Sequence, residues 1–123
     1  MYRTLLKAKI HRAVVTQADL HYEGSITIDA DLLQASGIYA YERVQVLDIE
    51  NGARLETYVI VGPAGSGLIQ MNGPAARLVS VGDHIIIMAY AQVAEPVPAD
   101  WQPTVILVDG DNRIGGQGPA TGG

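Results

Sequence analysis

Apolar and polar positions alternate along much of this chain, a pattern typical of half-buried β-strands. In the segment 5–15, LLKAKIHRAVV, one face carries Lys7, Lys9, His11 and Ala13, and the positions between them are mostly apolar. We therefore expect the chain to open with a strand that buries one face and presents cations on the other.

A hairpin and a short helix follow from local signals. The runs RVQVLDI (43–49) and LETYVIV (55–61) are joined at Asn51-Gly52, a dipeptide that favours tight turns. Asp29 as an N-cap and Gly37 as a C-terminal glycine bound a short helix in DADLLQASG. Further strands are expected around 20–28, 68–71, 84–93 and 104–110, with at most one helical turn in 72–78.

This succession of short strands predicts a mainly β domain, a small barrel with its site at the mouth. The length of 123 residues suits a single domain. We place that domain at 1–112. The Gly-rich remainder, 113–123, ends in GGQGPATGG without an apolar pattern and is expected to be disordered.

Composition excludes several function classes. The net charge of −5 and a pI near 4.9 argue against nucleic-acid binding, which requires a basic face. No apolar run is long enough to cross a membrane, and charge returns too early for a signal peptide, so we expect a cytoplasmic protein. Cysteine is absent, and no histidine–carboxylate spacing suggests metal ligands, so no metal is expected.

The segment ADLHYEGSITIDADLL (18–33) raises a chemical question at Gly24-Ser25. A turn or bulge is the usual role of such a step. A serine hydrolase is an alternative, although the nucleophile-elbow pattern G-x-S-x-G is absent. A third chemistry also fits. The serine hydroxyl attacks the preceding carbonyl, and elimination and hydrolysis then cut the chain and leave a pyruvoyl group.

Three segments of the sequence favour the third interpretation, self-cleavage, because they resemble a known family. KIHRAVVTQADLHYEGS, NGARLETY and MNGPAARLVSVGDHIIIMAY closely resemble the pyruvoyl-dependent aspartate 1-decarboxylases, in order and spacing, from about Arg3 to Asn112. The resemblance implies a six-stranded double-psi β-barrel with one or two short helices. It also implies self-cleavage between Gly24 and Ser25 into a short N-terminal β chain and a longer C-terminal α chain.

The resemblance also implies the cofactor and the reaction. Ser25 would become the covalent pyruvoyl group and form a Schiff base with L-aspartate, and Tyr58 would donate the proton that replaces CO2. The product is β-alanine for pantothenate and coenzyme A synthesis. The family assembles as homotetramers with sites between subunits, and some members need an accessory maturation protein.

Further site residues follow by matching the family pattern. The cations Lys9 and Arg54 would hold the substrate carboxylates. Thr57 would contact substrate and steady the oxyanion of self-cleavage, although alternation places it opposite Tyr58. The remaining residues assigned to processing are Tyr22, His11 and Asn72, and those assigned to substrate binding are Gly73, Pro74 and Ala75.

Two positions differ from many relatives. Family members often carry alanine at the position of Pro74, and a proline has no backbone N–H to donate. Ile26 stands where some relatives have a smaller residue. The rival interpretation is a barrel that never matures and serves as a ligand-binding or assembly module.

Overall fold

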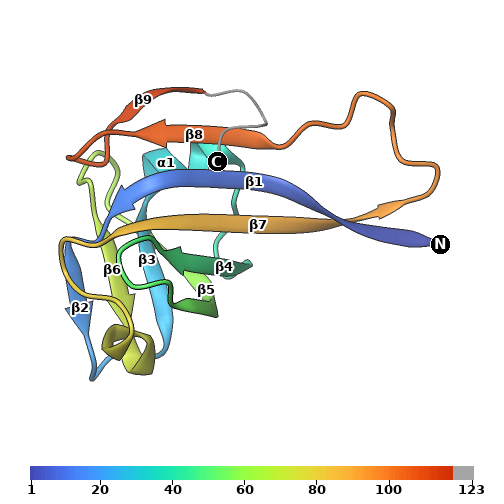
Figure 1. Ribbon diagram of the computed structural model, residues 1–123. Coiled ribbons are helices and arrows are strands. Elements are labelled where there is room, and N and C mark those ends of the chain that lie inside the picture. The colour runs from blue at the N-terminus through green and yellow to red at the C-terminus, as the bar shows by residue number, and fades with distance from the viewer. Residues whose placement is uncertain (118–123) are drawn as a thin grey trace.

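The structure, a computed structural model, describes residues 1–117 and consists of strands with two short helices (Figure 1). The elements in chain order are β1 (Tyr2–Val14), β2 (Gln17–Asp19), β3 (Ser25–Asp29), α1 (Ala30–Ser36), β4 (Arg43–Asp48), β5 (Arg54–Gly62), β6 (Ile69–Asn72), the 3-10 helix η1 (Gly73–Arg77), β7 (His84–Ala94), β8 (Thr104–Val108) and β9 (Ile114–Gln117). The predicted mainly β domain is confirmed.

All strands belong to one hydrogen-bonded sheet in the order β2-β6-β3-β5-β4-β7-β1-β8-β9. Residues 1–117 form nine strands where the resemblance implied a six-stranded barrel, and the short strands β2 and β9 extend the sheet at its two ends. The long antiparallel pair β1 and β7 runs across the molecule, and the N-terminus lies at its far end (Figure 1). The core is aliphatic, with fully buried residues that include Ile10, Ile26, Ile69 and Ile87.

Local signals place the hairpin and the helix as expected. Strands β4 and β5 pair antiparallel up to Leu47 and Arg54, and Gly52 takes a positive φ of 76° in the turn between them. The side chain of Asp29 accepts a hydrogen bond from the N–H of Asp31, and Gly37 closes α1 in the left-handed conformation. Two predictions from local capping rules are therefore confirmed.

One face assignment in β1 was wrong. Alternation placed Ala13 with the charged residues, but Ala13 is fully buried. The register against β7 shifts between His11 and Ala13, and Arg12 adopts a positive φ of 66° there. This bulge moves the next side chain to the opposite face of the strand, as an extra residue in a ladder does.

The expected start of the disordered tail, residue 113, also needs correction. Ile114–Gln117 form β9, which pairs with β8. A sheet edge offers unpaired backbone groups to any extended segment, so pairing does not require an apolar side-chain pattern. The rest of the predicted tail, 118–123, lies outside the described residues. Within 1–117, no helix is long and apolar enough to span a membrane.

Candidate active site around Gly24-Ser25

Ser25 is a buried serine placed directly after an exposed glycine. It begins β3 and pairs with Asn72 of the antiparallel strand β6. Its side chain is fully buried, its hydroxyl donates to the carbonyl of Glu23 at 3.0 Å, and it accepts a hydrogen bond from Asn72 Nδ2 at 2.9 Å. The hydroxyl is thus held in one orientation beside the Gly24-Ser25 peptide bond.

Two neighbours fix the amide of Asn72. Gln70 Nε2 donates to Asn72 Oδ1 at 2.8 Å, and Asn72 Nδ2 also reaches Thr27 Oγ1 at 3.1 Å. Sequence analysis missed Gln70 and Thr27 as site residues. A signal was present: each lies two positions from a predicted site residue, Asn72 or Ser25, on a strand, and side chains two apart share a face.

Gly73 presses against the peptide before Ser25. It has a φ of +73°, and a Cβ on it would lie 2.7 Å from Gly24 Cα and 3.1 Å from the carbonyl oxygen of Tyr22. Pro74 Cδ lies 4.0 Å from where a Cβ on Gly24 would be. The loop after Asn72 therefore covers the Gly24 backbone, and glycine is required where the two segments meet.

Tyr58 lies in the strand next to Ser25. Strands β3 and β5 run parallel with Ile26 opposite Val59, so the preceding residues of the two strands, Ser25 and Tyr58, lie side by side. Tyr58 is half-buried. Thr57 is half-buried too, and alternation along β5 directs it away from the face of Tyr58.

The two cations predicted to bind the substrate carboxylates do not lie beside Ser25 in the strand order. Arg54 begins β5 four residues before Tyr58, which corresponds to about 13 Å of extended strand. Lys9 is on β1, which three strands (β5, β4 and β7) separate from β3 in the sheet order. Ser25, Asn72 and Tyr58 thus lie on three adjacent strands, whereas Lys9 lies on a strand that does not pair with any of these three and Arg54 lies at the start of β5.

His11 shares β1 with Lys9 and is unusual in its hydrogen bonding. Its Nδ1 is buried and has no hydrogen-bond partner among the described residues. Burial lowers the pKa of His11, and the positive charges of Lys9 and Arg12 lower it further. At neutral pH the ring is therefore uncharged.

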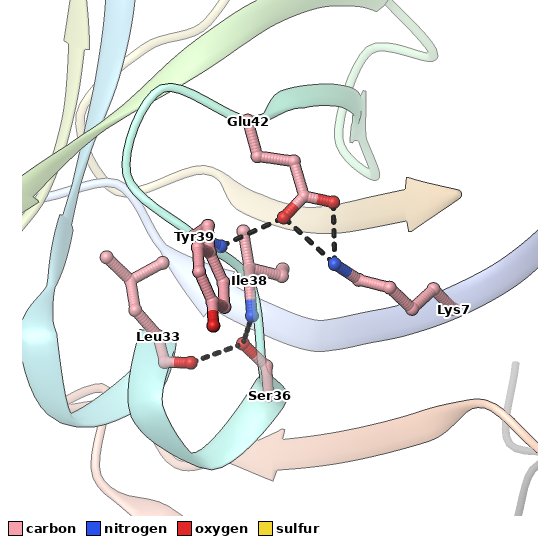
Figure 2. A network of polar contacts seen from close by, with 6 residues as sticks. All are labelled: Lys7, Leu33, Ser36, Ile38, Tyr39 and Glu42. Atoms are coloured by element: carbon pink, nitrogen blue, oxygen red, sulfur yellow. Dashed lines mark hydrogen bonds and ion pairs between the residues drawn. The ribbon is translucent and has the colours of Figure 1, made fainter. Parts of the chain in front are cut away.

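A salt bridge between Lys7 and Glu42 braces the turn that leads into β4 (Figure 2). Lys7 Nζ donates to the two carboxylate oxygens of Glu42 at 2.9 and 2.7 Å, and Glu42 also accepts the N–H of Tyr39 at 2.9 Å. The backbone of this turn pairs with Val59 through Tyr41 N to Val59 O at 2.7 Å and Val59 N to Glu42 O at 3.1 Å. The salt bridge thus stabilises the turn that is hydrogen-bonded to β5 at Val59, the residue that follows Tyr58.

The other predicted residues take peripheral positions. Tyr22 is half-exposed in the segment before Ser25, and Ala75 packs against the core from η1. Two surface hollows of about 490 and 360 Å³ are lined by residues of β1, β4, β5 and β7 and by residues around α1, respectively. Ser25, Tyr58 and Asn72 line neither hollow.

Comparisons with known proteins agree with one another. The model of the family described as aspartate decarboxylase matches residues 1–115. Aspartate 1-decarboxylase of Carboxydothermus hydrogenoformans is 59% identical over 93% of this chain and 90% of that protein. The Neisseria meningitidis protein of the same name is 57% identical over the same shares.

A Frankia casuarinae protein, aspartate 1-decarboxylase 1, is 60% identical over 93% of this chain and 74% of its own length. Among solved structures, the rationally designed mkDPBB_sym_86 protein aligns with a TM-score of 0.46 at 18% identity, covering 64% of this chain and 91% of its own.

Proposed function

Because the chain belongs to the aspartate decarboxylase family, we propose that it is a carboxy-lyase that converts L-aspartate to β-alanine and CO2 after cutting itself between Gly24 and Ser25. The observation that carries this proposal is the buried Ser25 hydroxyl, held by Asn72 beside a glycine whose backbone is exposed. Within the described chain, the partners recorded for this hydroxyl are an amide and a backbone carbonyl. Neither is the imidazole of a serine hydrolase.

Maturation uses atoms of this segment and one water molecule. Ser25 Oγ attacks the Gly24 carbonyl carbon, the C–N bond breaks, and the acyl group moves to oxygen as an ester with a free amine on residue 25. Loss of the Ser25 α-proton then expels the Gly24 carboxylate and leaves dehydroalanine. Its imine form adds water and releases ammonia, which leaves the pyruvoyl ketone at residue 25.

The surrounding residues suit this sequence of steps. Asn72 Nδ2 already donates to Ser25 Oγ, so it orients an oxygen lone pair and restricts rotation of the hydroxyl. Gly24 has no side chain to obstruct attack on its carbonyl, and Gly73 covers it closely from one side. Thr57 remains our candidate for steadying the oxyanion, and His11 and Tyr22 remain candidates for supporting the cleavage.

The pyruvoyl ketone supplies an electron-withdrawing carbonyl that condenses with the substrate amine and stabilises the charge left when CO2 departs. Tyr58 would deliver the replacing proton, because a phenol is protonated at neutral pH and this one lies in the strand beside residue 25. Lys9 and Arg54 would hold the two carboxylates, while Gly73, Pro74 and Ala75 line the substrate pocket. Pro74 contributes no N–H there.

A homotetramer with sites between subunits completes the proposal. It is supported by the strand order, in which Lys9 lies on a strand that does not pair with β3 and Arg54 lies at the start of β5, since a second copy can supply these cations to Ser25. Mixing Lys9→Ala and Tyr58→Phe chains tests it. If the two residues of each site come from different chains, random mixing restores about one quarter of the sites. Activity that stays absent in mixed assemblies contradicts shared sites.

Decarboxylation itself is tested by following ¹³C-labelled L-aspartate by NMR. The wild-type protein is expected to release labelled β-alanine, and Tyr58→Phe to lower kcat at least about 100-fold, as loss of a general acid does. Tyr41→Phe, which alters a residue 77% exposed, is the matched control and should leave the rate unchanged. Aspartate that remains unchanged with wild-type protein whose chain has been cut would contradict the proposed reaction.

The proposal also includes the cellular compartment and the pathway of the product. We place the enzyme in the cytoplasm, where β-alanine would enter pantothenate and coenzyme A synthesis. An accessory maturation protein belongs to the proposal only if the purified chain remains uncut. In that event, adding host extract is the direct test of whether a partner is needed.

A further inference from the structure

Three acidic side chains meet at the end of the β4–β5 hairpin. Asp48 ends β4, Glu50 lies in the turn that follows, and Asp83 lies in the loop before β7. One carboxylate oxygen from each lies within 4.8 Å of the others. The sequence did not reveal this cluster, because Asp83 is 33 positions beyond Glu50 in the chain and comes close to it only through the pairing of β4 with β7.

Asp48 brings a carboxylate oxygen without a donor into this cluster. Its side chain is 2% exposed, and its Oδ2 is buried with no hydrogen-bond partner among the described residues. Its other oxygen, Oδ1, accepts the N–H of Glu50 at 2.8 Å. A buried carboxylate oxygen facing a second carboxylate needs a cation or a shared proton nearby, because like charges at this separation repel strongly.

The other contacts of the cluster come from two backbone N–H groups and the ring of His84. Asp83 Oδ2 accepts the N–H of Ser80 at 3.0 Å. Glu50 Oε2 accepts the N–H of His84 at 2.6 Å, and Oε1 lies 3.3 Å from His84 Nδ1. His84 therefore faces Glu50 from the edge of the cluster.

We propose that Asp48, Glu50 and Asp83 bind a calcium ion. All three ligands are hard oxygen donors, which calcium and magnesium prefer over the nitrogen and sulfur ligands of zinc. Calcium accepts six to eight oxygen ligands in flexible geometry, whereas magnesium demands a near-ideal octahedron, so three carboxylates from one strand end and two loops fit calcium better. Water molecules would fill the remaining positions, so the dissociation constant should be on the order of 10⁻⁴ to 10⁻³ M.

Calorimetric titration of the metal-stripped wild-type protein with CaCl2 to 10 mM at pH 7.5 tests the proposal, and thermal unfolding is measured in parallel. Calcium at about ten times its dissociation constant should raise the unfolding midpoint by roughly 3–8 °C. Magnesium chloride at the same concentration should bind at least about tenfold more weakly.

The variant Asp48→Asn separates calcium binding from folding. An asparagine keeps the acceptor for the N–H of Glu50, and its amide donates to Asp83, so the hairpin end stays folded without an ion. Calcium binding should weaken at least about tenfold in this variant. Asp100→Asn, the same change at an exposed site in the 95–103 connection, should bind calcium like the wild type.

Two results would overturn the proposal. The first is no calcium binding by the wild type up to 10 mM. If stability also rises as the pH falls from 8 to 6, a proton shared between Asp48 and Asp83 takes the place of the ion. The second is calcium binding of equal strength in Asp48→Asn, which would place the ion elsewhere.

Discussion

Gly73 and Gly24 approach each other so closely that a methyl group on Gly73 would overlap the backbone of the proposed cleavage site. A Cβ at residue 73 would lie 2.7 Å from Gly24 Cα and 2.8 Å from Gly24 N. The contact joins the first residue of η1 to the segment before β3. It explains why glycine at 73 matters for the site as well as for the turn.

Gly73→Ala is therefore expected to slow or stop self-cleavage and to cost more stability than its backbone angle alone requires. Gly52→Ala is the matched control, because its φ of +76° is nearly the same but no atom lies within 4 Å of an added Cβ. The control should lose about 1 kcal/mol and cleave normally. Denaturant unfolding and the fraction of cut chain after a fixed incubation measure both effects. Equal behaviour of the two variants would contradict the account.

Asn72→Asp should stop cleavage while the chain remains folded. The change keeps the shape of the side chain but removes the N–H that reaches Ser25 Oγ, and it adds a negative charge beside a developing oxyanion. Thr27→Val, which removes another partner of the same amide at similar volume, is the control and should reduce the rate far less. The measurement is the time course of cleavage on denaturing gels. Cleavage of Asn72→Asp at the wild-type rate would show that the hydrogen bond is incidental.

Asp29 should make stability depend on pH in acid. Burial raises the pKa of Asp29, but hydrogen bonds from the N–H groups of Asp31, Gly67 and Gly65, aided by the charge of Arg113, outweigh it and lower the pKa below its usual value. The unfolded chain thus binds the proton more readily. The contribution is fully present above about pH 4 and is lost as pH falls through the lower folded pKa.

Asp29→Asn checks this assignment. The variant should be less stable than the wild type at pH 7, because its amide nitrogen cannot accept a hydrogen bond from a backbone N–H. The difference in unfolding free energy should shrink below about pH 4 as the wild type loses its charged carboxylate. Urea titrations at several pH values measure it. A difference that stays constant from pH 7 to pH 2 would show that the charge of Asp29 is not the source.

Glu42→Gln should destabilise the fold by on the order of 1–2 kcal/mol, because it weakens the partly buried salt bridge with Lys7. That salt bridge stabilises the turn that is hydrogen-bonded to Val59. Glu56→Gln alters an exposed ion pair with Arg43 at 3.6 Å and should change stability by less than about 0.5 kcal/mol. Thermal unfolding of both variants distinguishes them. Equal shifts would mean that the salt bridge with Lys7 contributes no more than a surface pair.

Local chemistry predicted much of the fold, and three-dimensional proximity accounts for what it missed. Asp29, Gly37 and Asn51-Gly52 act within a few residues, so capping and turn rules located the helix and hairpin. The bulge at Arg12 depends on the partner strand β7, so alternation alone misplaced Ala13. Strand β9 also depends on a partner, because it forms on the free edge of β8.

The residues of the candidate site likewise divide into those that the sequence pointed to and those that it did not. Gly24-Ser25 was found because its chemistry is local and because the resemblance covers it. Gln70 and Thr27 act through Asn72 and were missed, since no local motif requires them. The roles of Lys9 and Arg54 follow from the resemblance alone, because the alternation of polar and apolar residues marks only the strand face on which each cation lies.

The most direct test of the central claim is the intact mass of the purified, warmed protein, recorded with and without borohydride in the presence of L-aspartate. We predict two fragments: one that ends at Gly24, and one that begins with a pyruvoyl group at residue 25 and gains the mass of reduced aspartate when borohydride is added. A single uncut chain without an adduct, even after incubation with host extract, would contradict the claim.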